Sequence, residues 1–162
     1  AGPAAAAHQR LTRIAHEVLP FGTFAAFHQN GTVMKPPGRY VLKKLYVHTP
    51  APAYFSHDQL KFPVDPLPPV GEGQLRLKEP VVAVTIDGAT VVYPLSRLEA
   101  RADERGVFTT EQAGVPLTFT CYRGAKSARV EAKAEGRNVE VNHCAWFCWH
   151  AFHPADPVFG DA

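Results

Sequence analysis

The stretch EPVVAVTIDGATVVYPL, residues 79–95, carries the clearest signal for the fold. Two runs rich in β-branched residues, VVAVTI and ATVVY, flank the pair Asp87 and Gly88. Such side chains favour strands, and an Asp-Gly pair between two such runs is typical of a tight β-hairpin turn. The stretch therefore predicts a β-hairpin.

Segments on both sides of this hairpin predict further short elements. Residues 95–106 predict a short helix that ends at Gly106. Runs of strand-forming residues predict four more strands, at residues 39–49, 115–122, 127–134 and 138–144. A turn at residues 135–137 is expected to join the last two of them.

The N-terminal part of the chain has a different character. Residues 4–18 place apolar side chains at helical spacing, which predicts an amphipathic helix. Prolines cluster between Pro50 and Pro80, so a continuous helix is not expected there. Three aromatic residues, Tyr54, Phe55 and Phe62, are expected to hold this segment against the core.

Together these elements predict an α+β fold. It is mainly antiparallel β, with an N-terminal helix or arm and a proline-rich crossing segment, because strands and helices do not alternate along the chain. Residues 1–35 are expected to form the helix and arm, and residues 36–162 a single β-rich domain.

Composition excludes several classes of protein. The 162 residues are 46% hydrophobic and 20% charged, which is ordinary for a globular domain. The net charge of +2 implies no dense basic face for nucleic acid, and the basic segments RLKEP and VLKKL are interpreted as strand-edge lysines. No apolar run approaches the about 20 residues of a membrane span. The first residues, AGPAAAA, resemble what signal peptidase leaves behind, so a periplasmic or extracellular location is expected.

The stretch NHCAWFCWHAFHP, residues 142–154, is the candidate site. Cys144, Cys148, His150 and His153 offer the thiolate and imidazole ligands that copper and zinc use. Cys121 is expected on a strand next to the one that leads into Cys144, which would make it an additional ligand.

Two other interpretations of this stretch stay open. One is packing, in which Trp146, Phe147, Trp149 and Phe152 build a core and Cys121 forms a disulfide with Cys144 or Cys148. The other is a reactive thiol. An enzyme is not favoured, because no serine stands in a nucleophile elbow and the acidic residues resemble a solvated loop.

Three blocks of the chain, taken in order, carry a family resemblance. They are IDGATVVYPLSRL, AGVPLTFTCYRGAKSARV and WFCWHAFHPADPVF. The series, from Val81 to Phe159, resembles the family called domain of unknown function 3179, found mostly in exported bacterial and archaeal proteins. The resemblance implies the fold and an exported location, and no reaction.

The chain departs from that family's pattern at three points. Gly124 stands where the pattern has the second cysteine of a C-x-x-C, and Cys148 and His150 stand where it has small residues. The segment between the second and third blocks is also shorter. The sequence therefore indicates a divergent, shortened member.

Two hypotheses about function follow. The first is an exported metal-binding protein, for copper or zinc, that uses the cysteine and histidine cluster. The second is a non-catalytic structural subunit of an extracellular polymer, or an accessory subunit of a larger complex. An arm longer than the core needs and an odd number of cysteines, three, favour the second. Self-association or other protein subunits are the expected partners.

Overall fold

The hairpin predicted from residues 79–95 is confirmed. In the computed structural model, which describes residues 18–32 and 51–161, β1 (Pro80–Ile86) pairs antiparallel with β2 (Ala89–Pro94). Asp87 and Gly88 have φ angles of 48° and 88°. Both central residues of a type I′ turn need positive φ, so the Asp-Gly pair fits the turn that joins these strands.

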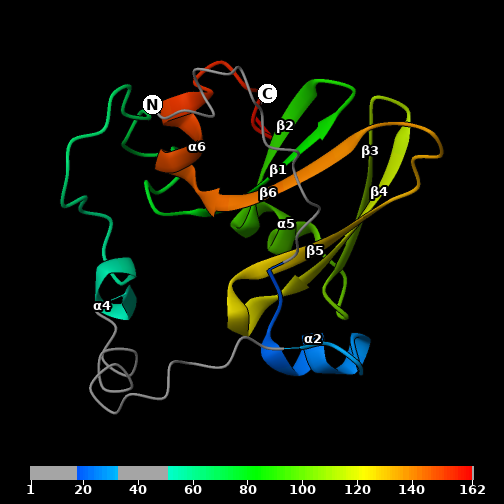
Figure 1. Cartoon of the computed structure of the whole chain (residues 1–162). Helices are drawn as coiled ribbons and strands as arrows, with labels where there is room; N and C mark the ends of the chain where they lie inside the picture. Colours follow the sequence, from blue (N-terminus) through cyan, green and yellow to red (C-terminus); the bar gives the residue numbers. More distant parts are fainter. Residues whose placement is uncertain (1–17, 33–50, 162) are drawn as a thin grey trace, which may run out of the picture.

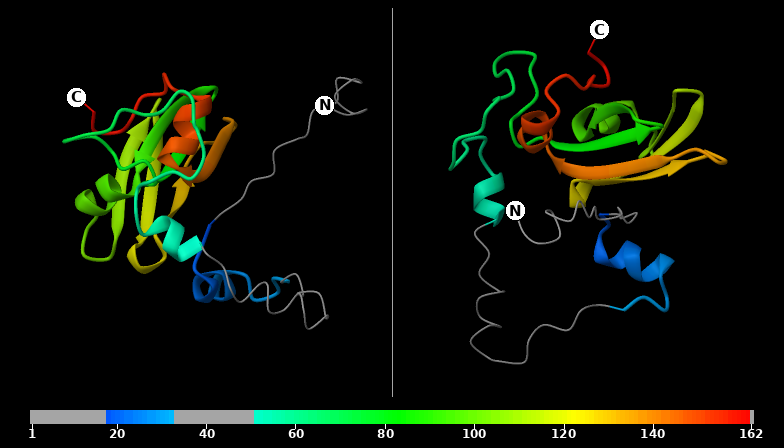
Figure 2. Two further views of the ribbon diagram at one scale, coloured as in Figure 1. Left: turned by 90° about the vertical axis from the view of Figure 1, so that its left-hand side faces the viewer. Right: turned by 45° about the horizontal axis from the view of Figure 1, so that its top comes forward.

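The strands form two sheets of three. In one sheet, β6 (Val139–Ala145) pairs with the free side of β1, which gives the order β2-β1-β6. The other has the order β3-β4-β5, built from β3 (Val107–Gln112), β4 (Val115–Tyr122) and β5 (Ser127–Ala132). The four pairings between these strands are antiparallel, and an isolated parallel bridge joins Val92 of β2 to Val158. The two sheets lie as two layers (Figures 1 and 2), and the predicted α+β, mainly antiparallel fold is confirmed.

The main core lies between the two sheets. Alternate residues of β1, such as Val82 and Val84, pack with alternate residues of β4, such as Leu117 and Phe119. This is the period of two expected when one face of each strand is buried. The opposite face of β1 is buried too, because Val81 packs in a second cluster with tryptophans of α6 (Trp146–Phe152).

The helix predicted at residues 95–106 is shorter than expected. It is α5 (Leu95–Arg101), and it buries Leu95 and Leu98 in the core. The helix ends early because the Asp103 carboxylate accepts hydrogen bonds from the backbone N–H groups of Arg105 and Val107, at 2.9 and 2.8 Å. This local bonding offers the backbone a turn instead of another helical turn.

The strands predicted at 115–122, 127–134 and 138–144 are confirmed as β4, β5 and β6. Strand β3 was not predicted. The turn at residues 135–137 is present, but the strands on either side of it enter different sheets. The expected neighbourhood of Cys121 and Cys144 is therefore wrong, because Cys121 lies on β4 and Cys144 on β6.

Two further helices lie outside the sheets. α2 (Phe21–Phe27) has no buried residue, and the Arg129 guanidinium of β5 lies 4.6 Å from the Phe27 ring centroid. α4 (Ala51–Phe55) opens the proline-rich segment, which has no helix or strand from residue 56 to residue 79. The absence of a continuous helix there is as predicted.

Several predicted features cannot be compared with the structure. The helix at residues 4–18 lies outside the described residues apart from Val18, and so do the strand at 39–49 and the boundary between residues 35 and 36. In the part of the chain that is described, no helix has the length and apolar character needed to span a membrane.

Candidate binding pocket

Strands β5 and β6 follow one another in the chain but diverge from the turn that joins them, since each enters its own sheet (Figure 1). A pocket of about 400 Å³ lies where the strands are farthest from the turn, at the start of β5 and the end of β6. Elements β1, α4, α5 and α6 complete its wall. The volume falls within the range of about 300–1,000 Å³ that is common for small-molecule sites.

The wall of this pocket is mainly apolar. Val81, Val82 and Ala128 are buried residues of the facing strands, and Leu95 and Phe147 come from α5 and α6. Their aliphatic and aromatic surfaces favour an apolar occupant, because such contact removes hydrocarbon from water on both sides.

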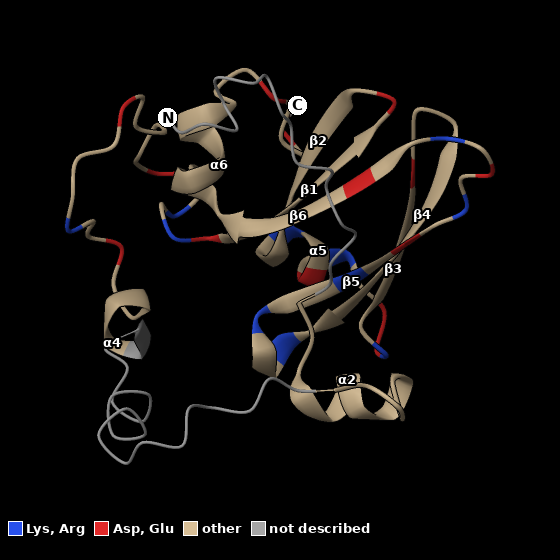
Figure 3. Cartoon of the chain, in the orientation of Figure 1, with Lys and Arg blue, Asp and Glu red and all other residues tan. Residues whose placement is uncertain are grey.

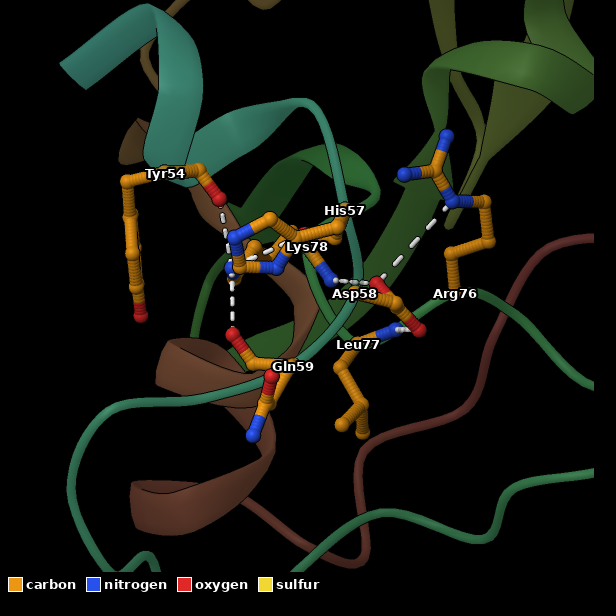
Figure 4. Close-up of polar contacts among 7 residues, drawn as sticks. All are labelled: Tyr54, His57, Asp58, Gln59, Arg76, Leu77 and Lys78. Atoms are coloured by element: carbon orange, nitrogen blue, oxygen red, sulfur yellow. Dashed lines mark hydrogen bonds and ion pairs between the residues drawn. The ribbon is translucent and has the colours of Figure 1, made fainter.

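A buried lysine, Lys78, is one of the residues that line the pocket, and Figure 4 shows its polar contacts. The Lys78 ammonium donates hydrogen bonds to the backbone carbonyls of Tyr54, His57 and Gln59, at 2.6, 2.8 and 2.6 Å. An ammonium has three hydrogens, so all of its donors are engaged. Burial lowers the pKa of Lys78, and the nearby Asp58 carboxylate opposes this shift by favouring the charged form.

We call Lys78 and the three carbonyls that it binds the lysine clamp. Asp58 strengthens the same junction, since its carboxylate accepts hydrogen bonds from the backbone N–H groups of Leu77 and Lys78, at 2.8 and 2.9 Å. The clamp joins residues 54–59 to Lys78, about 20 residues further along the chain, and so holds Phe55 in the pocket wall. The sequence interpretation, which placed Lys78 in a strand-edge basic patch, missed this role. No motif in the proline-rich segment signals three accepting carbonyls.

Two of the predicted site residues, Cys144 and Cys148, line the pocket as free thiols. Cys144 lies near the end of β6 and Cys148 in the first turn of α6. Burial raises the pKa of Cys144 to about 11, and the nearby Cys148 adds to the rise, while the backbone N–H of Trp149 opposes it. Burial also raises the pKa of Cys148. Both sulfurs are therefore protonated at neutral pH.

Cys121 is placed apart from these two thiols. It is buried in the core between the sheets, opposite Ala128 of β5, and it is a free thiol. Burial is the main reason that the pKa of Cys121 is raised. Cys144, in contrast, packs against the cluster on the outer face of β1. The disulfide from Cys121 to Cys144 or Cys148 stays a prediction.

The two predicted histidine ligands contact tryptophan rings. His150 meets Trp146 edge-on at 5.1 Å between ring centroids, and His153 stacks on Trp149 at 4.4 Å. Within residues 18–32 and 51–161, no group of three or more histidine, cysteine or acidic residues could hold a metal ion. The structure thus brings Cys144 and Cys148 to one wall and does not gather all five predicted ligands, so the metal site stays a prediction.

The packing interpretation of the same stretch is confirmed in part. Trp146, Phe147 and Trp149 are buried, as expected for a helix that covers a sheet. Phe152 is 82% exposed, so its assignment to the core is wrong. It is the last residue of α6.

The described residues thus form an α+β fold of two facing antiparallel sheets, with an apolar pocket between the diverging ends of β5 and β6. The chain belongs to the family described as Protein of unknown function (DUF3179), whose family model matches residues 2–145. The family prediction is confirmed, but its range was wrong: the match begins well before Val81 and ends at residue 145, before the third block that carried the resemblance. No curated protein and no solved structure matches the chain.

Proposed function

We propose that this chain is a non-catalytic binding protein whose pocket takes an apolar group. The pocket between the diverging ends of β5 and β6 carries the proposal, because it is of ligand size and its wall is mainly hydrocarbon. The lysine clamp supports it as well. Its three hydrogen bonds keep Phe55 in the wall, which reduces the entropy lost when an occupant binds.

The chemistry of the pocket favours binding over catalysis. A reactive cysteine has a lowered pKa, whereas burial raises the pKa of both Cys144 and Cys148. The Lys78 ammonium is held by three carbonyls, so it does not offer a lone pair for attack. The two thiols and the Lys78 ammonium are therefore better suited to line a ligand pocket than to attack a substrate.

The proposed setting is an exported accessory or structural subunit. A group of exposed apolar side chains on one element, unlike a single one, is typical of a protein contact site. Phe21 of α2 is 70% exposed, and Phe27 at the other end of this helix and Phe152 of α6 are exposed too. They support association with other subunits or with further copies of this chain.

Binding of the neutral fluorescent probe Nile red tests the proposed function. We expect its fluorescence to rise with saturation in the wild-type protein. The Cys148→Trp variant fills the pocket with an indole, so we expect the affinity to fall about tenfold or more, a loss of about 1.4 kcal/mol. The matched control is Phe152→Trp, which places the same ring on the same helix outside the pocket wall and should bind like wild type.

A second pocket variant tests the same point if Cys148→Trp does not fold. Val18 lies at the pocket and is exposed, so Val18→Trp adds bulk without disturbing buried packing. Circular dichroism of each variant checks that the fold is kept. Folded variants that bind Nile red as wild type does would refute a binding role for the pocket.

Binding of a soft metal ion is a second candidate, favoured by the position of Cys144 and Cys148 on one wall. Thiolates select copper(I) and zinc. A metal would have to displace the thiol protons, which the raised pKa of Cys144 makes harder. Copper that co-purifies with the wild-type chain and is lost in Cys144→Ser would support this candidate.

A further inference from the structure

We propose that the occupant of the pocket is an aliphatic chain that ends in a negatively charged head group. This inference rests on the proposed binding function and narrows it to one class of ligand. The tail would lie against the hydrocarbon wall, and the head group would lie at the start of β5.

The charged residues around the pocket favour a ligand with a negative head group. Of the described residues that line the pocket, two are lysines, Lys78 and Lys126, and none is an aspartate or glutamate. Lys78 is committed to the lysine clamp, but Lys126 is exposed at the rim. Figure 3 shows basic residues in the turn before β5 and at its start, where Arg123 adds a second exposed positive charge.

The backbone at this rim has a positive φ at a residue other than glycine, as it also has at Asp87 and Ala113. Lys126 has φ of 48° and lies in the left-handed region, which costs energy for residues other than glycine, asparagine and aspartate. It ends the short 3₁₀ turn η1 (Arg123–Ala125) and is followed at once by the buried start of β5. This turn places Lys126 at the rim of the pocket, directly before the strand that forms part of its wall.

A hydroxyl next to this lysine supports the same head group. Ser127 is 6% exposed, and its Oγ is buried with no hydrogen-bond partner among the described residues. Buried polar groups normally have a partner. A ligand carboxylate at the rim would accept from the Lys126 ammonium and, after rotation of the Ser127 side chain, from this hydroxyl.

The test is competition for the Nile red site by three compounds that share one tail, namely dodecanoate, dodecanol and dodecylammonium, each below its micelle concentration. We expect dodecanoate to displace the probe best, and dodecylammonium worst. Lys126→Glu should lower the affinity for dodecanoate about fivefold, because it replaces an exposed positive charge beside the head group with a negative one. The affinity for dodecanol should not change. The control is Lys133→Glu, the same change at an exposed lysine beyond the other end of β5, which should have no effect.

The outcomes separate the inference from the function on which it rests. If Nile red does not bind, the proposed binding function fails. If Nile red binds and none of the three compounds displaces it, the aliphatic occupant is wrong while the binding function stands, and an apolar segment of a partner protein becomes the better occupant. If all three compete equally, or Lys126→Glu matches Lys133→Glu, the anionic head group is wrong.

Discussion

The Phe119→Ala variant is expected to lower the free energy of unfolding by about 3–5 kcal/mol. Phe119 is 0% exposed at the centre of β4. Its ring centroid lies 4.7 Å from that of Tyr93 in the other sheet and 6.2 Å from that of Phe108. Removal of the ring leaves a cavity between the sheets that neighbouring side chains fill only in part. Urea unfolding followed by circular dichroism measures the change.

The control for Phe119→Ala is Phe152→Ala, the same substitution at a side chain that is 82% exposed. Its free energy of unfolding should stay within about 0.5 kcal/mol of wild type. If the two variants proved equally stable, the core would not lie between the two sheets as described. The loss expected for Phe119 is a large part of the about 5–15 kcal/mol that holds a domain together.

The second large effect concerns the thiol of Cys144. At neutral pH we expect iodoacetamide to alkylate Cys144 about 100-fold more slowly in the folded protein than in urea, because only the thiolate reacts. Burial raises the pKa of Cys144 from 9.0 to about 11, which lowers the thiolate fraction by two powers of ten. Mass spectrometry of the peptide that contains Cys144 measures the rate.

The pH dependence of this reaction has a definite sign. The unfolded chain loses the Cys144 proton near pH 9 and the folded chain near pH 11. The folded-state rate should therefore keep rising with pH after the unfolded-state rate has levelled off. The raised pKa also makes the free energy of unfolding depend on pH. The contribution of the protonated Cys144 thiol is fully present below pH 9 and is lost as the pH rises toward 11. Equal rates in folded and unfolded protein at neutral pH would contradict the burial of this thiol.

The strands with the clearest sequence signal are those whose buried faces carry β-branched and apolar residues. β1, β2 and β4 are rich in β-branched and apolar residues because both faces of β1 and alternate residues of β4 are buried. β3 carries VFTTEQ, in which valine, phenylalanine and two threonines favour a strand, so it was missed although a local signal is present; its conformation is completed by antiparallel pairing with β4. Its Gln112 is buried and bonds to Tyr93 and to the Val84 carbonyl across the sheets, which no local pattern signals.

The candidate site was predictable only where neighbours in the sequence are neighbours in space. Cys144 and Cys148 lie together because a strand runs directly into a helix at Ala145. The pocket itself depends on the separation of β5 and β6 into two sheets, although one turn joins them. That separation, like the reach of Lys78 to the carbonyls of residues 54–59, is set by tertiary packing.

The most direct test of the pocket as a binding site uses its own cysteines as reporters. Cys148 lines the pocket and is partly exposed, while Cys121 is buried in the core outside the pocket wall. The measurement is the rate of alkylation of each cysteine by peptide mass spectrometry, with and without saturating dodecanoate. We expect dodecanoate to slow the labelling of Cys148 and to leave that of Cys121 unchanged. Labelling of Cys148 at the same rate in both samples, with dodecanoate bound, would show that the ligand lies elsewhere and would contradict the account.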